Sequence, residues 1–346
     1  MKYLSLFSGI GGFEIGISNV YPDAICVGFS EVDKHAIQVY THHFPEHENL
    51  GDIIGVTEEQ VKKLVKKHDG IDLVVGGFPC QNLSSLARCF KYTNSDGLEG
   101  PKSSLFYSMI QVIKWIQKYN PVDLHLLAEN NASMSNANKK LITDTFEGIF
   151  KKVWMTKLNG ADFGVQTRRR MYWTTFEVSV DNIVCSQTWD DVLEPMEKCM
   201  SECVSEKAIS SANKEYKMKN TDKKIICEHV VGATDVYVFK IYIDMEYITR
   251  WQISPRADTL KFKSCTFLRG RRLDNYLIDR RVSGNKETFI VRQFLPVEVE
   301  RLFWIPDGWV STLCSKTRCT FLLGNTVVVK VIEHILNYFA INTGWR

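Results

Sequence analysis

The stretch KYLSLFSGIGGFE, residues 2–14, joins an apolar strand-like run to a helix-like run through Gly9, Gly11 and Gly12. Glycine has no Cβ, so backbone N–H groups in such a loop can approach a ligand closely. The glycine spacing differs from the Gly-x-Gly-x-x-Gly of dinucleotide folds, which argues against an NAD-linked oxidoreductase. Taken alone, the loop fits either a nucleotide-like ligand or a plain tight turn.

The first 180 residues alternate strand-like and helix-like segments. The helix candidates carry apolar residues three and four positions apart, and strands separated by such helices predict βαβ units. We therefore expect an α/β fold with a mostly parallel, doubly wound sheet that binds ligands beyond the carboxyl ends of its strands. The strand candidates are residues 2–7, 24–30, 71–77, 123–129 and 170–176, and the helix candidates are 34–44, 57–68 and 103–119.

Composition narrows the class of protein. The chain has 346 residues, 45% of them hydrophobic and 24% charged, and a net charge of +3, which is too small to predict nucleic-acid binding by itself. No apolar run approaches the roughly 18 residues that span a bilayer. We expect an intracellular, soluble protein, cytoplasmic or, in a eukaryotic host, nuclear. No metal site is expected. The closest cysteine pairs, Cys199 with Cys203 and Cys314 with Cys319, lack the matching second pair of a zinc site, and the histidines His42, His43 and His47 fit a helix end better than a metal site.

The pattern changes after about residue 177. Residues 181–228 are polar and show no clear alternation, residues 236–243 form a strand candidate, and LRGRRLDNYLIDRR at 268–281 is basic with an interleaved tyrosine. This region predicts a second, smaller lobe. Regular patterning returns with a helix that Pro296 begins and Pro306 ends, and with an amphipathic helix near the C-terminus.

Side chains that could bind a ligand or take part in catalysis follow the predicted strands. Glu31 and Asp52 come after the second strand, where acids can bind ribose hydroxyls and an adenine amino group. In LVVGGFPCQNLS, residues 73–84, an apolar strand leads directly to Cys80. Glu129 ends another strand, at the same expected sheet edge, where burial would raise its pKa and let it donate a proton. The arginines of QTRRR, residues 166–170, have forks that fit carboxylates or phosphates.

These motifs occur in a specific order. The chain contains LFSGIGGFE, SEVDKHAIQVYTHHFP, GDI, GGFPCQNLS, KSSLF, AEN, QTRRRMYWT, LPVEVERLFWIPDGW and LLGNTVVV. This set resembles the DNA cytosine-5 methyltransferase family, including its bacterial and viral members, from Leu4 to about His334. The resemblance implies a Rossmann-like methyltransferase sheet with a smaller target-recognition lobe. It implies a catalytic domain of residues 1–180 plus 321–346 and a target-recognition domain of residues 181–320.

The resemblance also implies a reaction, methyl transfer from S-adenosyl-L-methionine to carbon 5 of cytosine in duplex DNA. Cys80 would add to carbon 6 of the base as a thiolate and form a covalent adduct. Glu129 would hold the exocyclic amine and N3, Arg168 would bind the base carbonyl, and Arg170 would support Glu129. The implied cofactor residues are Phe7, Ile10, Gly12, Glu31, Val32, Asp52, Ile53, Pro79, Leu105 and Asn325.

Carbon 6 is inaccessible in a stacked duplex, so the target base should flip out of the helix. The segment 81–100 has the composition of a loop that closes over DNA. In it Leu86 is either an apolar wedge or a core residue, and Arg88 is a candidate phosphate contact. The full set of expected DNA-binding residues is Gln81, Ser84, Leu86, Arg88, Arg269, Arg271 and Arg272.

Some interpretations stay open. Asn131 stands where the family has valine, which could loosen the strand end that aims Glu129. KSCTFLRG, residues 263–270, faintly resembles a signature of tRNA cytosine-5 methyltransferases, and a catalytically weak DNA-binding homologue is the other alternative. We expect a monomer that acts on double-stranded DNA, with no membrane and no metal partner. Whether a restriction endonuclease accompanies it is left open.

Overall fold

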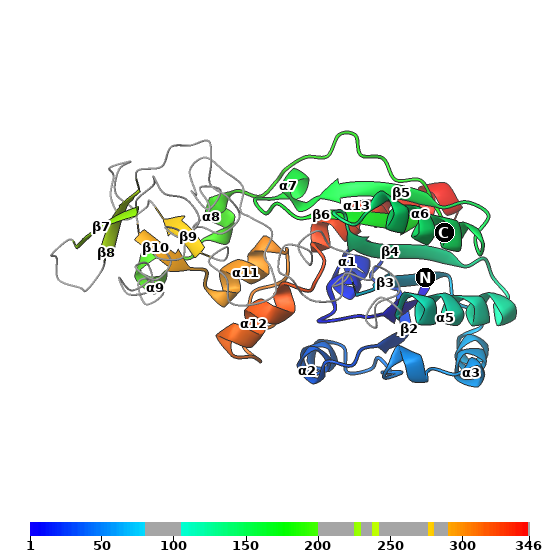
Figure 1. The fold of residues 1–346 in the computed structure, drawn as a ribbon. Helices are drawn as coiled ribbons and strands as arrows, with labels where there is room; N and C mark the ends of the chain where they lie inside the picture. The colour runs from blue at the N-terminus through cyan, green and yellow to red at the C-terminus, as the bar shows by residue number, and fades with distance from the viewer. Residues whose placement is uncertain (80–104, 200–224, 230–236, 242–275, 280–289, 345–346) are drawn as a thin grey trace. The chain divides into compact units, whose positions relative to one another are not determined.

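The computed structural model describes residues 1–79, 105–199, 225–229, 237–241, 276–279 and 290–344 (Figure 1). The chain forms two compact units. The first unit contains residues 1–162, 169–184 and 326–346, and the second contains residues 163–168 and 185–325. The chain passes from the first unit to the second after Val184 and returns to the first after Asn325. The functional division into catalytic and target-recognition domains stays a prediction.

A six-stranded sheet forms the centre of the first unit, in the order β2-β1-β3-β4-β6-β5. Strands β1 to β4 are parallel, whereas β6 runs antiparallel to both β4 and β5. The bounds are β1 Lys2–Leu6, β2 Ile25–Ser30, β3 Leu73–Gly77, β4 His125–Asn131, β5 Trp154–Asn159 and β6 Arg169–Thr174. The α/β fold class is confirmed. Strand β5 was not predicted. The sheet is mostly parallel, as expected, and β6 is antiparallel to both of its neighbours.

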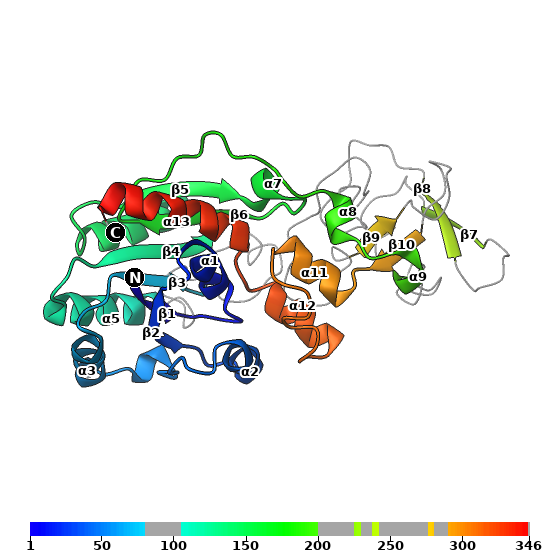
Figure 2. The same cartoon turned by 180° about the vertical axis from the view of Figure 1, so that it is seen from behind.

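Helices cover both faces of this sheet, as a doubly wound fold requires (Figures 1 and 2). Side chains alternate along each strand, so Leu4 and Leu6 pack into the same hydrophobic core as residues of α3, α5 and α6. Helices α1 and α13 pack against each other. The helices of this unit are α1 Gly12–Val20, α2 Lys34–His43, the 3₁₀ turn η1 Ile53–Gly55, α3 Glu58–His68, α5 Leu105–Tyr119, α6 Asn136–Glu147 and α13 Val329–Thr343, with α7 Gly160–Phe163 at its boundary.

Local sequence signals explain several helix starts. Asp33 caps α2 by accepting hydrogen bonds from the backbone N–H groups of His35 and Ala36. Thr57 and Gln60 form a reciprocal capping box at the start of α3. The predicted helices at residues 34–44, 57–68 and 103–119 are confirmed by α2, α3 and α5, whose ends lie within two residues of the predicted ones.

The second unit is built from short elements. Its helices are α8 Trp189–Val192, α9 Met196–Cys199, α11 Pro296–Leu302 and α12 Lys316–Leu323. Two antiparallel pairs of strands join β7 Ile225–His229 with β8 Tyr237–Ile241, and β9 Tyr276–Asp279 with β10 Ile290–Gln293. Pro296 begins α11 as predicted, but the predicted end at Pro306 is wrong. Trp304 adopts a left-handed conformation with φ 60°, and the Ile305 N–H donates back to the Glu300 carbonyl, which closes the helix earlier.

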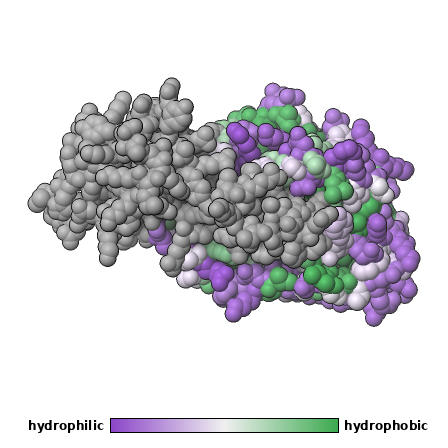
Figure 3. All heavy atoms as spheres, viewed as in Figure 1, coloured by the Kyte–Doolittle hydropathy of each residue, from purple (hydrophilic) through white to green (hydrophobic). Residues whose placement is uncertain are grey.

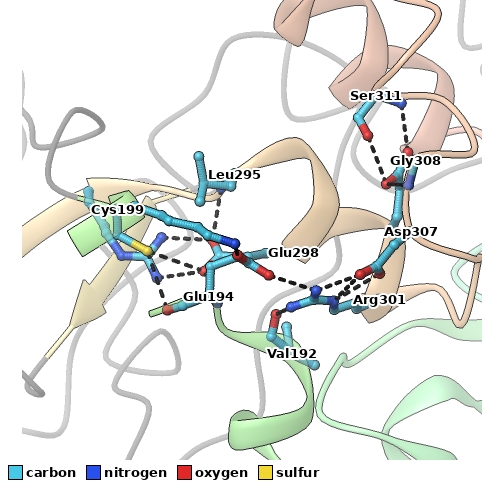
Figure 4. Close-up of polar contacts among 12 residues, drawn as sticks. Val192, Glu194, Cys199, Leu295, Glu298, Arg301, Asp307, Gly308 and Ser311 are labelled. Atoms are coloured by element: carbon cyan, nitrogen blue, oxygen red, sulfur yellow. Dashed lines mark hydrogen bonds and ion pairs between the residues drawn. The ribbon is translucent and has the colours of Figure 1, made fainter. Parts of the chain in front are cut away.

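A buried ion pair organises this unit (Figure 4). Arg292 and Glu298 are both fully buried, and their two hydrogen bonds measure 2.7 and 2.8 Å. The Glu298 carboxylate also accepts the backbone N–H groups of Glu194 and Leu295. Arg301 extends the network to Glu194, at 2.6 Å, and to Asp307. Since buried charges require partners, this network holds α11 to the segment around Glu194.

The described surface carries no dominant apolar area on the face seen in Figure 3, where hydrophobic patches are interspersed among hydrophilic residues. Single exposed apolar side chains are ordinary on protein surfaces. None of the helices in the described ranges combines the length and apolarity that crossing a membrane requires.

Candidate active site at the carboxyl edge of the sheet

The glycine loop follows β1 and has little room for side chains. Gly11 adopts φ 90°, and a Cβ at this position would lie 2.8 Å from the ring of Phe44. A Cβ at Gly12 would lie 2.5 Å from Thr326 Oγ1. Both positions therefore require glycine. Phe7, at the start of the loop, is half-buried with φ 57°, and Ile10 is buried.

Glu31 ties the end of β2 to this loop. Its carboxylate accepts the N–H of Gly9 at 2.8 Å and the N–H groups of Val32 and Asp33 at 2.7 and 2.9 Å. These three backbone donors hold the carboxylate in a single orientation. The neighbouring Val32 side chain is 64% exposed, so an apolar surface lies next to an oriented carboxylate.

Asp52 lies on the next loop, which runs beside the end of β2. The Leu50 N–H donates to the Phe29 carbonyl, and Ser30 Oγ donates to the Gly51 carbonyl, both at 2.7 Å. Asp52 is exposed and accepts the Ile54 N–H at 3.0 Å, whereas Ile53 is buried. The structure thus brings the segment containing Asp52 beside the end of β2, which Glu31 follows.

This edge has features that fit a nucleoside-bearing cofactor. Ser8 Oγ, in the glycine loop, is buried and has no hydrogen-bond partner within the described residues. The apolar residues Val32 and Ile54 are 64% and 66% exposed, next in sequence to the two acids. Oriented carboxylates suit hydroxyl and amino donors, and exposed apolar side chains suit a flat base. The residues present therefore fit the predicted cofactor.

The second part of the site lies where β3, β4 and β6 meet. Gly77 in β3 pairs in register with Glu129 in β4. A Cβ at Gly77 would lie 2.9 Å from Glu129 Oε2, so the glycine leaves room for the carboxylate. Because β6 is antiparallel to β4, its first residues return to the end of β4. Arg170 Nε consequently lies 2.8 Å from Glu129 Oε1, and both side chains are only about one-eighth exposed, at 12% and 13%.

Asn130, which sequence reasoning missed, connects this pair to the end of β3. It is 1% exposed, and its Nδ2 donates to the Phe78 carbonyl at 3.1 Å. Phe78 is two residues before Cys80. The position of Asn130, directly after a candidate acid at a strand end, was the signal available in the sequence.

Asn131 does not loosen the strand end in this structure. It is the last residue of β4 and pairs in register with Arg170 of β6. Its Oδ1 accepts both the N–H and the hydroxyl of Ser133, at 2.8 Å each. These bonds close the turn that follows the strand.

Arg168 belongs to the second unit, not to β6. Its side chain is 4% exposed, it donates to the Gly324 carbonyl at 3.1 Å, and its guanidinium lies 5.0 Å from the centre of the Phe303 ring. The predicted contact of Arg168 with a base carbonyl stays a prediction. The arginine that lies beside Glu129 is Arg170.

The remaining predicted cofactor residues are dispersed. Pro79 and Leu105 are half-buried, and Leu105 packs against the hydrophobic core of the first unit. Asn325 is exposed and is the last residue of the second unit. The predicted nucleophile and the predicted DNA contacts lie outside the described residues; these are Cys80, Gln81, Ser84, Leu86, Arg88, Arg269, Arg271 and Arg272. The segment 263–270 lies outside them as well.

The histidines near residue 45 have structural surroundings. His42 and His43 end α2, and His47 stacks on Phe44 with ring centres 5.0 Å apart. Within the ranges that the structure describes, no group of three or more His, Cys, Asp or Glu residues is arranged to hold a metal ion.

Comparisons with known proteins identify the family of this chain. The family model described as C-5 cytosine-specific DNA methylase matches residues 1–339. The orphan methyltransferase M.Rho11sI of Bacillus phage rho11s is 28% identical over 257 residues, 71% of this chain and 45% of that protein. The type II methyltransferase M.Sau3AI of Staphylococcus aureus is 24% identical and is covered over 95% of its length.

A solved structure, the Dnmt2 methyltransferase of S. pombe, shares the fold with a TM-score of 0.66 at 15% identity, covering 99% of this chain and 98% of that one. The chain spans less than half the length of the first curated relatives it matches, between 36% and 45% of the first three. The predicted cofactor, S-adenosyl-L-methionine, is the cofactor of the matched family. By the match of its family model over residues 1–339, the chain belongs to the C-5 cytosine-specific DNA methylase family.

Proposed function

We propose that this protein transfers a methyl group from S-adenosyl-L-methionine to carbon 5 of a flipped-out cytosine in duplex DNA, with Cys80 as the covalent nucleophile. The observation that carries the proposal is the Glu129–Arg170 pair next to Gly77. Cys80 is three residues after Gly77, and three residues of chain span at most about 11 Å. The short spacing in the sequence supports Cys80 as the nucleophile that acts together with Glu129.

The roles of these residues follow from the chemistry of the base. Carbon 5 of cytosine is a poor nucleophile until a thiolate adds to carbon 6, which makes the ring enamine-like. Glu129 then holds N3 and the exocyclic amine of the base by hydrogen bonds. Arg170 orients the Glu129 carboxylate through the 2.8 Å contact. After methylation, loss of the carbon 5 proton to a base, for which we propose water, expels the thiolate and restores the aromatic ring.

The cofactor, when bound, supplies the methyl group as an electrophile. Glu31 would accept the ribose hydroxyls, Asp52 the adenine amino group, and Val32 would contact the base. Phe7, Ile10, Gly12, Ile53, Pro79, Leu105 and Asn325 complete the proposed site. The backbone donors on Glu31 support this assignment, because they fix a carboxylate that needs no rearrangement to accept a ligand.

Target recognition is proposed for the second unit, with the predicted DNA contacts at Arg269, Arg271 and Arg272 positioning the phosphate backbone. Gln81, Ser84, Leu86 and Arg88 are proposed to contact DNA from the segment after Cys80. A monomer is the proposed state. Bisulfite sequencing of DNA treated with the purified protein would identify the bases that flank the target.

Trapping tests the covalent step. Duplex DNA with 5-fluorocytosine at the target carries a fluorine that cannot leave as the proton does, so the adduct should persist on a denaturing gel in the presence of cofactor. Cys80→Ser should abolish the adduct. Cys185→Ser, which removes an exposed cysteine of the second unit, should leave it intact. An adduct that survives Cys80→Ser would exclude the proposed nucleophile.

A second measurement tests the substrate. Tritiated methyl groups should be incorporated into duplex DNA and not into tRNA. Incorporation into tRNA alone would replace DNA as the proposed substrate and leave the proposed nucleophile in place. An absence of incorporation into both, with cofactor binding intact, would favour a DNA-binding homologue without catalysis.

A further inference from the structure

A buried acid lies beside the glycine loop and has no role in the proposed chemistry. Glu14 is in the first turn of α1 and is 1% exposed. Tyr40 of α2 donates its hydroxyl to Glu14 Oε1 at 3.0 Å. Glu14 Oε2 is buried without a hydrogen-bond partner within the described part of the chain.

The groups that face Glu14 carry no positive charge in the described residues. They are Tyr40 from α2, Ser5 and Tyr3 from β1, and Cys26 from β2. Helix α13 meets α1 through Ile332 at Gly16, and its Glu333 bonds to Asn19 at the far end of α1. Burial, the largest influence, raises the pKa of Glu14 to about 7, and its hydrogen bonds, including the one from Tyr40, lower the pKa only in part.

Tyr40 lies between the Glu14 carboxyl, the half-buried His47 and the glycine loop. Its hydroxyl lies 3.0 Å from His47 Nδ1, and burial lowers the pKa of that half-buried histidine, which favours its neutral form near pH 7. The Tyr40 ring stacks on Phe29 with centres 3.9 Å apart. A Cβ at Gly11 would lie 3.6 Å from Tyr40 Cδ2 and 2.8 Å from Phe44 Cε2, so the loop packs directly on these rings.

We propose that Glu14 is a positioning residue for the cofactor loop: its protonated carboxyl, held by Tyr40, keeps Gly11 and Gly12 in the binding conformation, and its ionisation weakens cofactor binding. The reason is that a carboxylate buried among neutral groups, with no cation beside it, is costly even when hydroxyl and backbone donors face it. Movement of the first turn of α1, or entry of water, relieves that cost. This inference rests on the proposed cofactor site.

The sign of the effect follows from linkage. The binding conformation retains the proton on Glu14, so raising the pH through 7 removes protons and weakens binding. If only the protonated form binds, the Kd rises by up to about tenfold per pH unit above the pKa. Glu14→Gln keeps the acceptor for Tyr40 and cannot ionise, so it should remove this dependence. Tyr40→Phe removes a hydrogen bond that lowers the pKa of Glu14, so it should shift the midpoint to higher pH.

Isothermal titration calorimetry tests the proposal on the full chain. S-adenosyl-L-homocysteine and S-adenosyl-L-methionine are titrated between pH 5.5 and pH 9 into the wild type, Glu14→Gln and Tyr40→Phe proteins. The α-amino group of the ligand titrates in all three proteins, so differences between the proteins isolate Glu14. The expected result is a Kd that rises with pH in the wild type, a flatter profile in Glu14→Gln and a midpoint moved upward in Tyr40→Phe.

Glu333→Gln is the control, because Glu333 is a second acid at the contact of α1 with α13 but is half-buried and paired with Lys330. It should keep the wild-type profile. Identical pH profiles in the wild type and Glu14→Gln would overturn the inference and leave the cofactor site standing. No binding by the wild type at any pH would overturn the cofactor site together with the inference. If Glu14→Gln is unfolded by circular dichroism, an unshifted midpoint in Tyr40→Phe overturns the inference alone.

Discussion

Arg170 orients Glu129 through a short contact, Nε to Oε1 at 2.8 Å. Lysine cannot reproduce the planar donor of a guanidinium at this place. A charge-assisted hydrogen bond is worth about 1.5–3 kcal/mol, so Arg170→Lys should lower kcat by roughly 10- to 100-fold. Methyl transfer to DNA measures this, with cofactor binding expected to be unchanged. Arg169→Lys, at the exposed neighbouring position, is the control and should retain wild-type kcat.

Asn130 holds the backbone immediately before the proposed nucleophile. Asn130→Ala removes the bond to the Phe78 carbonyl and the one that Oδ1 accepts from the Asn131 N–H at 2.7 Å. Leaving buried partners unsatisfied costs about 1–3 kcal/mol, which urea unfolding should detect. We also expect kcat to fall with little change in cofactor Kd. Asn337→Ala, an exposed asparagine on α13, should do neither. A variant with normal kcat would show that Asn130 acts on stability alone.

The sequence predicted Glu129 and Arg170 as partners because both belong to recognisable motifs. It could not predict the bond from Asn130 to Phe78, because that bond depends on the pairing of β3 with β4. Arg168 and Arg170 alternate as strand residues would, yet β6 begins only at Arg169. The spacing of the arginines does not show that the strand begins only after Arg168, which belongs to the second unit.

At the scale of elements, β5 shows where strand prediction from pattern fails. Half-buried residues alternate with exposed ones in its first four positions, and of its six residues only Leu158 is buried. An edge strand pairs on one side only and needs less apolar sequence than a central strand. The direction of β6 could not be predicted from the sequence either, because apolar and polar residues alternate in the same way in parallel and antiparallel strands.

The contact between α1 and α13 depends on a glycine. A Cβ at Gly16 would lie 2.7 Å from Ile332 Cγ2 and 2.9 Å from Ile332 Cβ, so Gly16→Ala forces the helices apart. Overpacking costs about 1–3 kcal/mol, which exceeds the helix-propensity gain of up to about 1 kcal/mol. Thermal unfolding should show the loss. Gly55→Ala meets no atom within 4 Å and should be neutral; equal stability of the two variants would contradict this packing.

At the scale of the whole molecule, the described part of the second unit contains a fully buried ion pair, Arg292 with Glu298. Arg292→Met leaves Glu298 fully buried without its cation. Breaking a buried pair by removing one partner costs about 3–5 kcal/mol. Lys140→Met breaks the exposed i,i+4 pair with Asp144 and should cost only about 0.3–0.5 kcal/mol. Urea unfolding of both variants measures the difference. Equal losses would show that the Arg292–Glu298 network does not organise the unit.

The first unit is discontinuous in the chain, because residues 185–325 are inserted before α13. A ribosome that adds about 5–20 residues per second needs roughly 7–30 s to synthesise this inserted segment before it reaches α13. During that interval α1 has been synthesised but the helix that covers it at Gly16 has not. The nascent chain therefore exposes an apolar helix face for many seconds, which makes the timing of synthesis part of the folding problem for this architecture.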